Sequence, residues 1–333
     1  MRPADALPPA EAAADIEDAF TFAVLPDSQA MIAYAPDVYV GVTKWVAARA
    51  AELDLRLVLH VGDVVDRGAA DLDQLAAARD AHATLFAAGI PLLVVPGNHD
   101  YDDLLERTRG LTGFNEFVGT ATLTRQPEYA GRFPCGGAEN SLLLLDGPVG
   151  GVLALGLEFG PRPEVVAWAD RVLAEHRDRR ALVVTHGYLD PDAERTSQRS
   201  RWHPRSYPGS VDGLDGAELW DRLLSRHPNV AMVFCGHQIT GAASYRVDAG
   251  ADGVPVLQSF QNWQCAPNDL LGCIRIVDWW PGRVRLRVVN TATGAPVSAP
   301  GYDVDLTLDA RAIGTRFPAA PDPLIPTDWP TVR

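Results

Sequence analysis

Short apolar runs of strand length recur along the chain and constrain its fold more than any other feature. They lie at residues 20–25, 55–61, 92–95, 141–145, 152–157, 182–185, 230–235 and 254–260. Such short continuous runs are typical of strands that are buried on both faces. Longer segments with helical spacing separate several of them, at residues 42–53, 72–88, 164–176 and 216–226. This alternation predicts an α/β fold with strand–helix–strand crossovers.

The apolar runs indicate one large domain at residues 20–310, flanked by two segments of different composition. Residues 1–19 are rich in Ala, Pro and acidic residues, and they lack the basic start and apolar stretch of a signal peptide. We expect them to form a flexible N-terminal tail. Within residues 270–308, Pro281 and Gly282 predict the turn of a β-hairpin. Residues 311–333 are Pro-rich and predict a C-terminal strap or tail.

The net charge, the lengths of the apolar segments and the cysteine spacing indicate which kinds of partner and which environment to expect. A net charge of −14 disfavours binding to nucleic acid or to an anionic membrane surface. No apolar segment is long enough to span a bilayer. The four cysteines show no C-x-x-C spacing, which favours reduced structural thiols. We therefore expect a cytoplasmic protein that binds a small molecule, and its oligomeric state stays open.

Polar side chains gather directly after the apolar runs. They are Asp27, Gln29, Asp63, Asp66, Arg67, Asn98, His99, His186 and His237. Ligands of open α/β sheets bind outside the carboxyl ends of the strands, so these loops should converge on one crevice. Carboxylate, amide oxygen and imidazole together suit Mn, Fe or Zn better than Ca. The sequence therefore predicts a site for a divalent metal.

Other histidines have simpler explanations. His60 precedes the Gly62–Asp63 turn, and we expect it to pack against or support the site without binding metal. His82, His176 and His227 lie on predicted helical faces or at helix ends, where surface or capping roles suffice.

The motifs "PDSQ", "GDVVDRG", "GNHD", "THG" and "GH" occur in this order between residues 20 and 240. Together they resemble the motifs of the calcineurin-like metallophosphoesterase superfamily. The resemblance implies a four-layer αββα sandwich and makes residues 20–310 the catalytic domain. The phrases "LPDSQ", "LEFGPR" and "NWQ" are further similar to a bacterial subgroup with an Asp-x-Gln first motif, where most relatives carry His in place of Gln.

The resemblance also implies a set of metal ligands. Asp63 would bridge two metals, and the second metal would be completed by Asn98, His186 and His237. Asp27, residue 29 and a histidine two positions after His237 would hold the first metal together with Asp63. This chain has Gln29 and Ile239 at those positions.

The first site therefore looks depleted, because isoleucine cannot coordinate and an amide oxygen is a weaker ligand than imidazole. Alternatively, Gln29 only hydrogen-bonds a neighbouring loop. Glu158 and His203 are candidates to fill the gap, and each is alternatively a satisfied core group. One or two ions per chain are expected.

Catalytic roles follow from the same resemblance. His99, paired with Asp66, would protonate the leaving oxygen, and Arg67 would bind a phosphate oxygen unless it forms a surface ion pair. The loop at residues 187–213 leaves directly from His186 and should form a wall of the pocket. Its Arg199, Arg201 and His203 are candidate substrate contacts, as is Glu158 outside this loop, and the arginine content of the loop suggests a multiply anionic ligand. The alternative is a solvated insertion.

The sequence thus favours a metal-dependent phosphoester hydrolase, a phosphatase or phosphodiesterase that uses a metal-bound hydroxide on a small anionic substrate. A second hypothesis keeps the fold but places a mononuclear or unusual dinuclear metalloenzyme on a non-phosphate substrate of a biosynthetic pathway. A third is a non-catalytic module that binds a phospholigand. The presence of His99 and Asp66 disfavours this third hypothesis, since a binder needs no acid over the leaving group.

Overall fold

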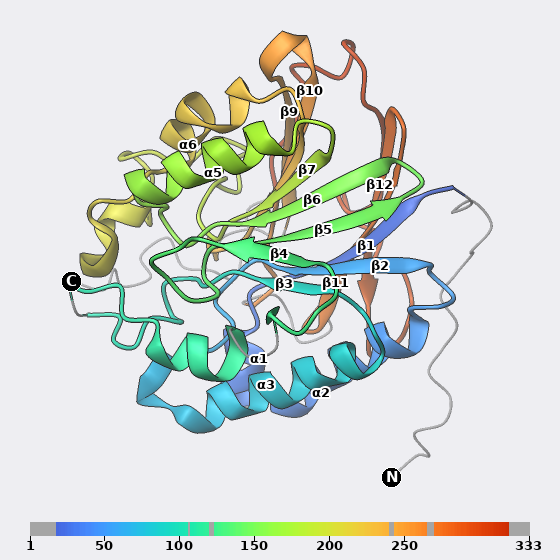
Figure 1. The fold of residues 1–333 in the computed structure, drawn as a ribbon. Helices are drawn as coiled ribbons and strands as arrows, with labels where there is room; N and C mark the ends of the chain where they lie inside the picture. The colour runs from blue at the N-terminus through green and yellow to red at the C-terminus, as the bar shows by residue number, and fades with distance from the viewer. Residues whose placement is uncertain (1–17, 106, 120–122, 240–242, 265–269, 320–333) are drawn as a thin grey trace.

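The computed structural model describes residues 18–105, 107–119, 123–239, 243–264 and 270–319, in which the strands form two packed β-sheets (Figure 1). The six-stranded sheet has the order β13-β12-β11-β1-β2-β3, and the eight-stranded sheet has the order β14-β9-β10-β8-β7-β6-β5-β4. The first contains β1 (Phe20–Leu25), β2 (Leu55–His60), β3 (Leu92–Val94), β11 (Cys273–Trp280), β12 (Arg283–Asn290) and β13 (Val304–Thr307). The second contains β4 (Tyr129–Arg132), β5 (Ser141–Gly147), β6 (Gly150–Gly156), β7 (Arg180–Val184), β8 (Val230–Cys235), β9 (Ala243–Ala249), β10 (Pro255–Gln261) and β14 (Arg316–Phe317).

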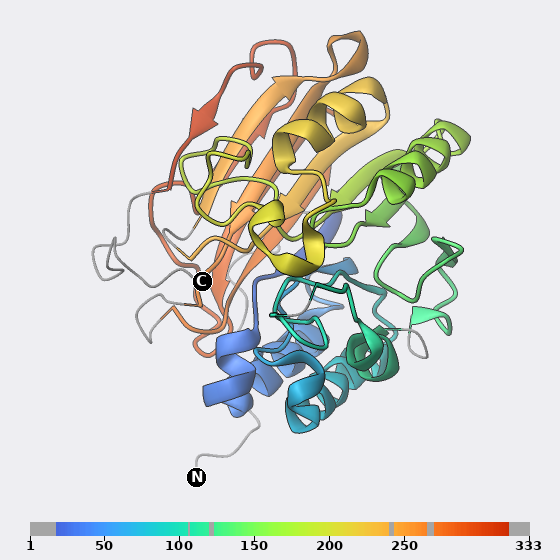
Figure 2. The ribbon, with the colours of Figure 1, turned by 90° about the vertical axis from the view of Figure 1, so that its left-hand side faces the viewer.

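Helices cover the outer faces of both sheets (Figures 1 and 2). α1 (Gln29–Tyr34), α2 (Pro36–Arg49) and α3 (Leu72–Ala87) lie on the six-stranded sheet, and α5 (Pro163–Glu175) and α6 (Gly216–Arg222) lie on the eight-stranded sheet. β7 shows why both sheet faces are buried. Its Leu182 belongs to the core cluster between the sheets, while Val183 belongs to the cluster beneath α5 and α6. The predicted four-layer αββα sandwich is confirmed.

Parallel pairing brings the carboxyl ends of the functional strands together. β1, β2 and β3 run parallel, with α2 and α3 in the crossovers. β6, β7, β8 and β10 also run parallel, with α5 and α6 in two of the crossovers. The loops that carry polar residues therefore leave each sheet at one edge.

Most predicted elements appear close to their expected positions, with two informative differences. The helix predicted from residue 42 begins at Pro36, where proline occupies the first helical turn. His82, expected to have a surface or capping role, is buried on α3 and lies 2.6 Å from the hydroxyl of Tyr39. The hairpin at Pro281 and Gly282 joins β11 to β12 as predicted.

The two flanking segments are only partly described. Residues 1–17 of the predicted N-terminal tail and residues 320–333 of the predicted C-terminal strap lie outside the described residues. The described part of the strap contains β14, which pairs with β9 at the edge of the eight-stranded sheet. None of the described helices is long and apolar enough to cross a membrane.

Candidate metal centre

The predicted ligands converge where the two sheets meet. Asp63 and Asn98 come from loops after β2 and β3 of the six-stranded sheet, and His186 and His237 come from loops after β7 and β8 of the eight-stranded sheet. All four side chains are buried. A carboxylate oxygen of Asp63 and one ring nitrogen from each histidine lie within 4.8 Å of one another, close enough to share one metal ion.

Two backbone carbonyl groups set the tautomers of the histidines. Nδ1 of His186 lies 2.8 Å from the carbonyl oxygen of Val61, and Nε2 of His237 lies 2.6 Å from that of Trp202. A carbonyl only accepts hydrogen bonds, so these two ring nitrogens carry the protons. The remaining nitrogens, Nε2 of His186 and Nδ1 of His237, face each other at 3.1 Å. Carbonyl-oriented imidazoles of this kind are typical metal ligands.

The charges of this pair are strongly shifted. Burial alone would lower the pKa of His186, but the nearby carboxylates of Asp63 and Asp27 raise it to about 9. Burial and the charge of His186 lower the pKa of His237 to about 3. At neutral pH the proton is therefore held by His186, beside the carboxylates, and His237 is neutral.

Asp63 lies at the centre of the group. Its Oδ2 is 3.2 Å from Nε2 of His186, and its Oδ1 accepts a hydrogen bond of 2.9 Å from the backbone N–H of His99. Although burial opposes it, the charge of His186 holds the pKa of Asp63 below its usual range. Asp63 adopts a left-handed backbone conformation with φ of 48°, as does His237 with φ of 79°. Such conformations in residues other than glycine cluster at functional sites.

Two buried side-chain oxygens without a hydrogen-bond partner in the described part of the chain support the interpretation of this group as a metal site. Oδ1 of Asn98 and Oε1 of Gln29 are buried and have no hydrogen-bond partner among the described residues. An unpaired buried acceptor is costly, so such an atom calls for an explanation. A metal bound by Asn98 together with Asp63, His186 and His237 satisfies the first of these oxygens with a donor set of carboxylate, amide and imidazole.

Asp27 lies next to this group but is held differently. Its carboxylate accepts hydrogen bonds from the backbone N–H of His237, at 3.0 Å, and from the side-chain amide of Asn262, at 2.7 Å. A Cβ at Gly236 would lie only 2.0 Å from Oδ1 of Asp27, so this close approach requires glycine. Burial raises the pKa of Asp27 to about 8, against the opposing charge of His186. Ile239, two positions after His237, is half-buried, and its hydrocarbon side chain has no atom that can bind a metal.

The three predicted catalytic residues, Asp66, Arg67 and His99, lie in the same loops as the candidate ligands Asp63 and Asn98. Nδ1 of His99 lies 2.9 Å from the carbonyl oxygen of Asp66 and 3.4 Å from its carboxylate, which leaves Nε2 unengaged by this pair. Burial opposes protonation, but the charge of Asp63 and the hydrogen bonds to Asp66 raise the pKa of His99 to about 10. Arg67 is exposed at the start of the 3₁₀ turn Gly68–Ala70.

The other candidates lie outside the group of three close ligands. Glu158 is buried, but its carboxylate binds the guanidinium of Arg162 at 2.8 Å and the side-chain amide of Asn140 at 3.0 Å. These contacts match the alternative of a satisfied core group. His203 is half-buried, and burial lowers its pKa. Arg199 and Arg201 are both exposed, with the Arg201 guanidinium 4.6 Å from the ring centre of Trp202.

Two buried residues at the site were not given a role from the sequence. Asp100 accepts hydrogen bonds from the backbone N–H groups of Val64, Val65 and Gly97, so it ties the loop after β2 to the loop after β3. Asn262 holds Asp27. Its position directly after a buried strand is the same signal that identified the metal ligands, and it applies here to β10.

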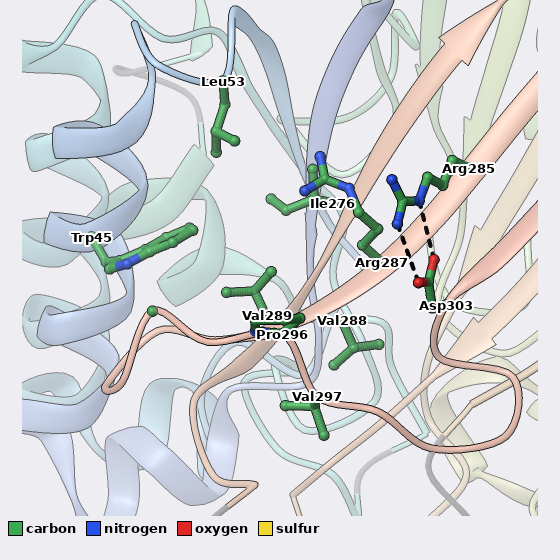
Figure 3. A pocket seen from close by; sticks show the side chains of 11 residues that line it. Trp45, Leu53, Ile276, Arg285, Arg287, Val288, Val289, Pro296, Val297 and Asp303 are labelled. Atoms are coloured by element: carbon green, nitrogen blue, oxygen red, sulfur yellow. Dashed lines mark hydrogen bonds and ion pairs between the residues drawn. The ribbon is translucent and has the colours of Figure 1, made fainter. Parts of the chain in front are cut away.

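A cavity of about 220 Å³ lies elsewhere, between α2 and the six-stranded sheet (Figure 3). Trp45, Leu53 and Ile276 form part of its apolar wall, and the ion pair between Arg285 and Asp303 borders it. None of its lining residues comes from the loops that carry the metal ligands, so it is separate from the candidate metal centre.

The chain is similar to one curated protein in sequence. Over 279 residues the chain is 25% identical to the uncharacterized protein YvnB of Bacillus subtilis (strain 168), an alignment that covers 83% of this chain and 19% of that protein. The chain thus spans about a fifth of the length of this curated relative.

Two solved structures share the fold at low identity. A dimetal phosphatase from Danio rerio aligns with a TM-score of 0.50 and 14% identity, over 87% of this chain and 99% of the other. Purple acid phosphatase PPD1 from yellow lupin (Lupinus luteus) seeds aligns with a TM-score of 0.50 and 11% identity, over 88% of this chain and 55% of the other. The sequence profile of the calcineurin-like phosphoesterases matches residues 20–241, well over half of the chain. The chain therefore belongs to the calcineurin-like phosphoesterase family.

Proposed function

We propose that this protein is a metal-dependent hydrolase of phosphoesters that acts on a small anionic substrate. The observation that carries the proposal is the buried group of Asp63, His186 and His237, beside the unpaired oxygen of Asn98. We place the protein in the cytoplasm, in the bacterial subgroup with the Asp-x-Gln first motif, and without a nucleic-acid or membrane partner. The net charge of −14 supports the last point.

Asp63, Asn98, His186 and His237 would hold a divalent ion of Mn, Fe or Zn. Such an ion acts as a Lewis acid that polarises a phosphoryl oxygen and neutralises charge as the reaction proceeds. Around it, the chain supplies the groups that orient the ligands. The carbonyl groups of Val61 and Trp202 hold the two imidazoles in the required tautomers.

His99 and Arg67 would serve the phosphoryl transfer itself. A water molecule adds its oxygen to phosphorus, and the bond between phosphorus and the leaving oxygen breaks. Nε2 of His99 gives its proton to that oxygen, while Nδ1 stays bound to Asp66. The proton released by the attacking water replaces the one that His99 donates, so the products are a phosphate group and an alcohol. Arg67 would bind a non-bridging phosphate oxygen through its planar guanidinium.

We further propose that one ion is held tightly and that the first site is depleted. The carboxylate of Asp27 already accepts two hydrogen bonds, and Ile239 supplies no donor atom. A single-metal centre also keeps a second candidate function open, a metalloenzyme that acts on a non-phosphate substrate of a biosynthetic pathway. The pairing of His99 with Asp66 argues against a non-catalytic binding module.

Metal analysis combined with a substrate panel tests the function. We expect about one tightly bound ion per chain and metal-dependent hydrolysis of phosphomonoesters or phosphodiesters. His237→Ala should lose the ion and the activity while keeping its circular dichroism spectrum. The control is His227→Ala, because His227 binds Asp170 away from the metal ligands. A protein that holds metal but hydrolyses no phosphoester would favour the non-phosphate enzyme. Full metal retention in His237→Ala would remove that residue from the site.

The number of ions has its own test. Gln29→His combined with Ile239→His should raise the metal content toward two ions per chain, because imidazole is the stronger donor for these ions. The measurement is metal per chain after gel filtration, with wild type alongside. Two tightly held ions in the wild type would contradict the depleted first site, and Gln29, Glu158 and His203 would then be the replacement ligands to examine.

A further inference from the structure

The loop after β7 contains a compact segment next to the metal centre. We call residues 200–212 the wall segment. It contains two short 3₁₀ turns, Pro204–Ser206 and Pro208–Ser210. The hydroxyl of Ser210 donates a hydrogen bond of 2.7 Å to the carbonyl of Pro204, and both residues are buried. These contacts show an ordered structure, contrary to the alternative of a solvated insertion.

Arg109 fastens the wall segment to the rest of the site. Its guanidinium donates hydrogen bonds to the carbonyl groups of Phe159, at 2.7 Å, and Gly160, at 2.8 Å. It also binds the carboxylate of Asp212 at 2.9 Å. Asp212 lies in the wall segment, while the two carbonyl groups belong to the loop after β6. One side chain from the loop after β3 thus joins three loops.

The face toward the metal centre is aromatic. The ring of Tyr207 lies 5.6 Å from the ring of His237 and 5.4 Å from that of Phe159, measured between ring centres. Tyr207 is half-buried, and among the described residues its hydroxyl has no hydrogen-bond partner. Trp202, also half-buried, binds His237 only through its backbone carbonyl, so its side chain takes no part in that contact.

Two arginines of this loop form ion pairs within the protein. Arg195 binds Asp248 at 2.7 Å, and Arg205 binds Glu218 at 2.6 Å. Both charges are therefore balanced within the protein. Arg201 is exposed with its guanidinium over Trp202. The rings of Tyr207 and Phe159 thus give the surface beside His237 an aromatic character, while Arg199 is exposed on the same loop.

We propose that the wall segment selects phosphoesters whose leaving alcohol carries a flat aromatic ring, and that Tyr207 is the side chain that packs against this ring. The inference rests on the proposed hydrolase function. A substrate phosphate bound at the metal centre would lie beside His237, and the leaving alcohol, which takes its proton from His99, would have to extend over the neighbouring Tyr207 for this contact to form. Aromatic rings in contact attract each other beyond their buried area, which gives such substrates an advantage of roughly three- to tenfold.

The test uses the metal-loaded chain and compares its hydrolysis of a benzyl phosphoester with that of a cyclohexylmethyl phosphoester. The two alcohols have similar leaving-group chemistry, but only the first carries a flat ring. We expect wild type to favour the benzyl ester by roughly three- to tenfold in kcat/KM. Tyr207→Leu should abolish this preference and Tyr207→Phe should keep it. Tyr34→Leu is the control, because Tyr34 is an exposed tyrosine on α1 outside the wall segment.

If the Tyr207→Leu variant does not fold, inhibition of the wild-type protein provides a second test. In wild type, benzylphosphonate should inhibit more strongly than cyclohexylmethylphosphonate by a similar factor. Equal rates and equal inhibition for each pair would overturn the aromatic preference while leaving the hydrolase intact. A preference that persists in Tyr207→Leu would overturn the role of Tyr207. Absence of metal-dependent hydrolysis of both esters would instead overturn the proposed function, and this inference with it.

Discussion

At the scale of single residues, the site depends on which atoms of each side chain are already engaged. Nδ1 of His186, Nε2 of His237 and Nδ1 of His99 each contact a backbone carbonyl, so in every case the other ring nitrogen is the one available for chemistry. The sequence identified these histidines because each follows an apolar strand. It could not identify the tautomers, because the carbonyl of Trp202 comes from a loop with no regular pattern.

The role of His99 as a proton donor can be tested by replacing its imidazole with a side chain that cannot act as an acid. In His99→Gln, the metal should remain bound and turnover should fall by roughly 10²–10⁴-fold, the usual contribution of a positioned general acid. The loss should shrink for esters with acidic leaving groups such as p-nitrophenol, which need no proton. His176→Gln at the end of α5 is the control. Equal losses for good and poor leaving groups would mean that His99 orients the substrate instead.

His82 gives a pH-dependent contribution to stability. Burial lowers its pKa from 6.5 to about 4, so the unfolded chain binds a proton more readily than the folded one. The stabilisation is complete above pH 6.5 and is lost as the pH falls toward 4. Between pH 7.5 and 4, the unfolding free energy of wild type should fall by about 3 kcal/mol more than that of His82→Gln. Urea unfolding at both pH values measures this, and equal decreases would show that His82 titrates normally.

At the scale of elements, the strands and crossovers could be predicted because their apolar runs are continuous and their lengths are typical. The contacts between these elements could not be predicted from the sequence. Asn262 holds Asp27 because β10 lies beside β8, and nothing in the local sequence fixes that neighbourhood. His82 faces inward because α3 packs against α2, where Tyr39 lies. Periodicity places a residue on a helix face but does not say what covers that face.

His60 joins two of the ligand loops. Its Nδ1 accepts a hydrogen bond of 3.2 Å from the N–H of Gly62, and its Nε2 lies 3.0 Å from the hydroxyl of Ser28. That hydroxyl donates to the carbonyl of Val64, and the backbone N–H of Ser28 donates to the carbonyl of Asp63. His60 and Ser28 therefore hold the loop after β1 against the loop after β2, as supporting residues of the metal centre.

Two substitutions of His60 can each keep one of its hydrogen bonds and remove the other. Asparagine can place an oxygen near the position of Nδ1 and keep the bond from Gly62, whereas glutamine can place a nitrogen near Nε2 and keep the bond to Ser28. We expect His60→Gln to weaken metal binding by roughly 10–100-fold, as for other supporting partners of metal ligands, and His60→Asn to weaken it less. Competition with a chelating dye measures the affinity. Unchanged affinity in both variants, with only a lower melting temperature, would reduce His60 to a packing role.

At the scale of the whole molecule, the candidate metal ligands come from both sheets. Asp63 and Asn98 follow strands of one sheet and His186 and His237 follow strands of the other, so an ion bound by all four would tie the sheets together. Family membership and the four-layer architecture were predictable, because the ordered motifs reflect this convergence. The position of Tyr207 in the wall segment was not, since the rings that it contacts, Phe159 and His237, belong to loops that follow other strands.

Removing the metal should therefore destabilise the entire domain. An ion present at 1,000 times its dissociation constant stabilises the folded state by about 4 kcal/mol, and its removal should lower the melting temperature by on the order of 5 °C or more. Differential scanning calorimetry with and without a chelator measures this. The His237→Ala variant should show little further change on chelation. A melting temperature that ignores the chelator would contradict a metal shared between the sheets.

The division of ligands between the sheets also bears on how the chain folds. Asp63 and His237 lie far apart in the sequence, and contacts of such long range form only after much of the chain has been ordered. Neither sheet alone offers the full set of four ligands. During refolding, the rate of metal uptake should therefore report when the two sheets dock, and a chain that has formed only the six-stranded sheet would leave the ion in solution.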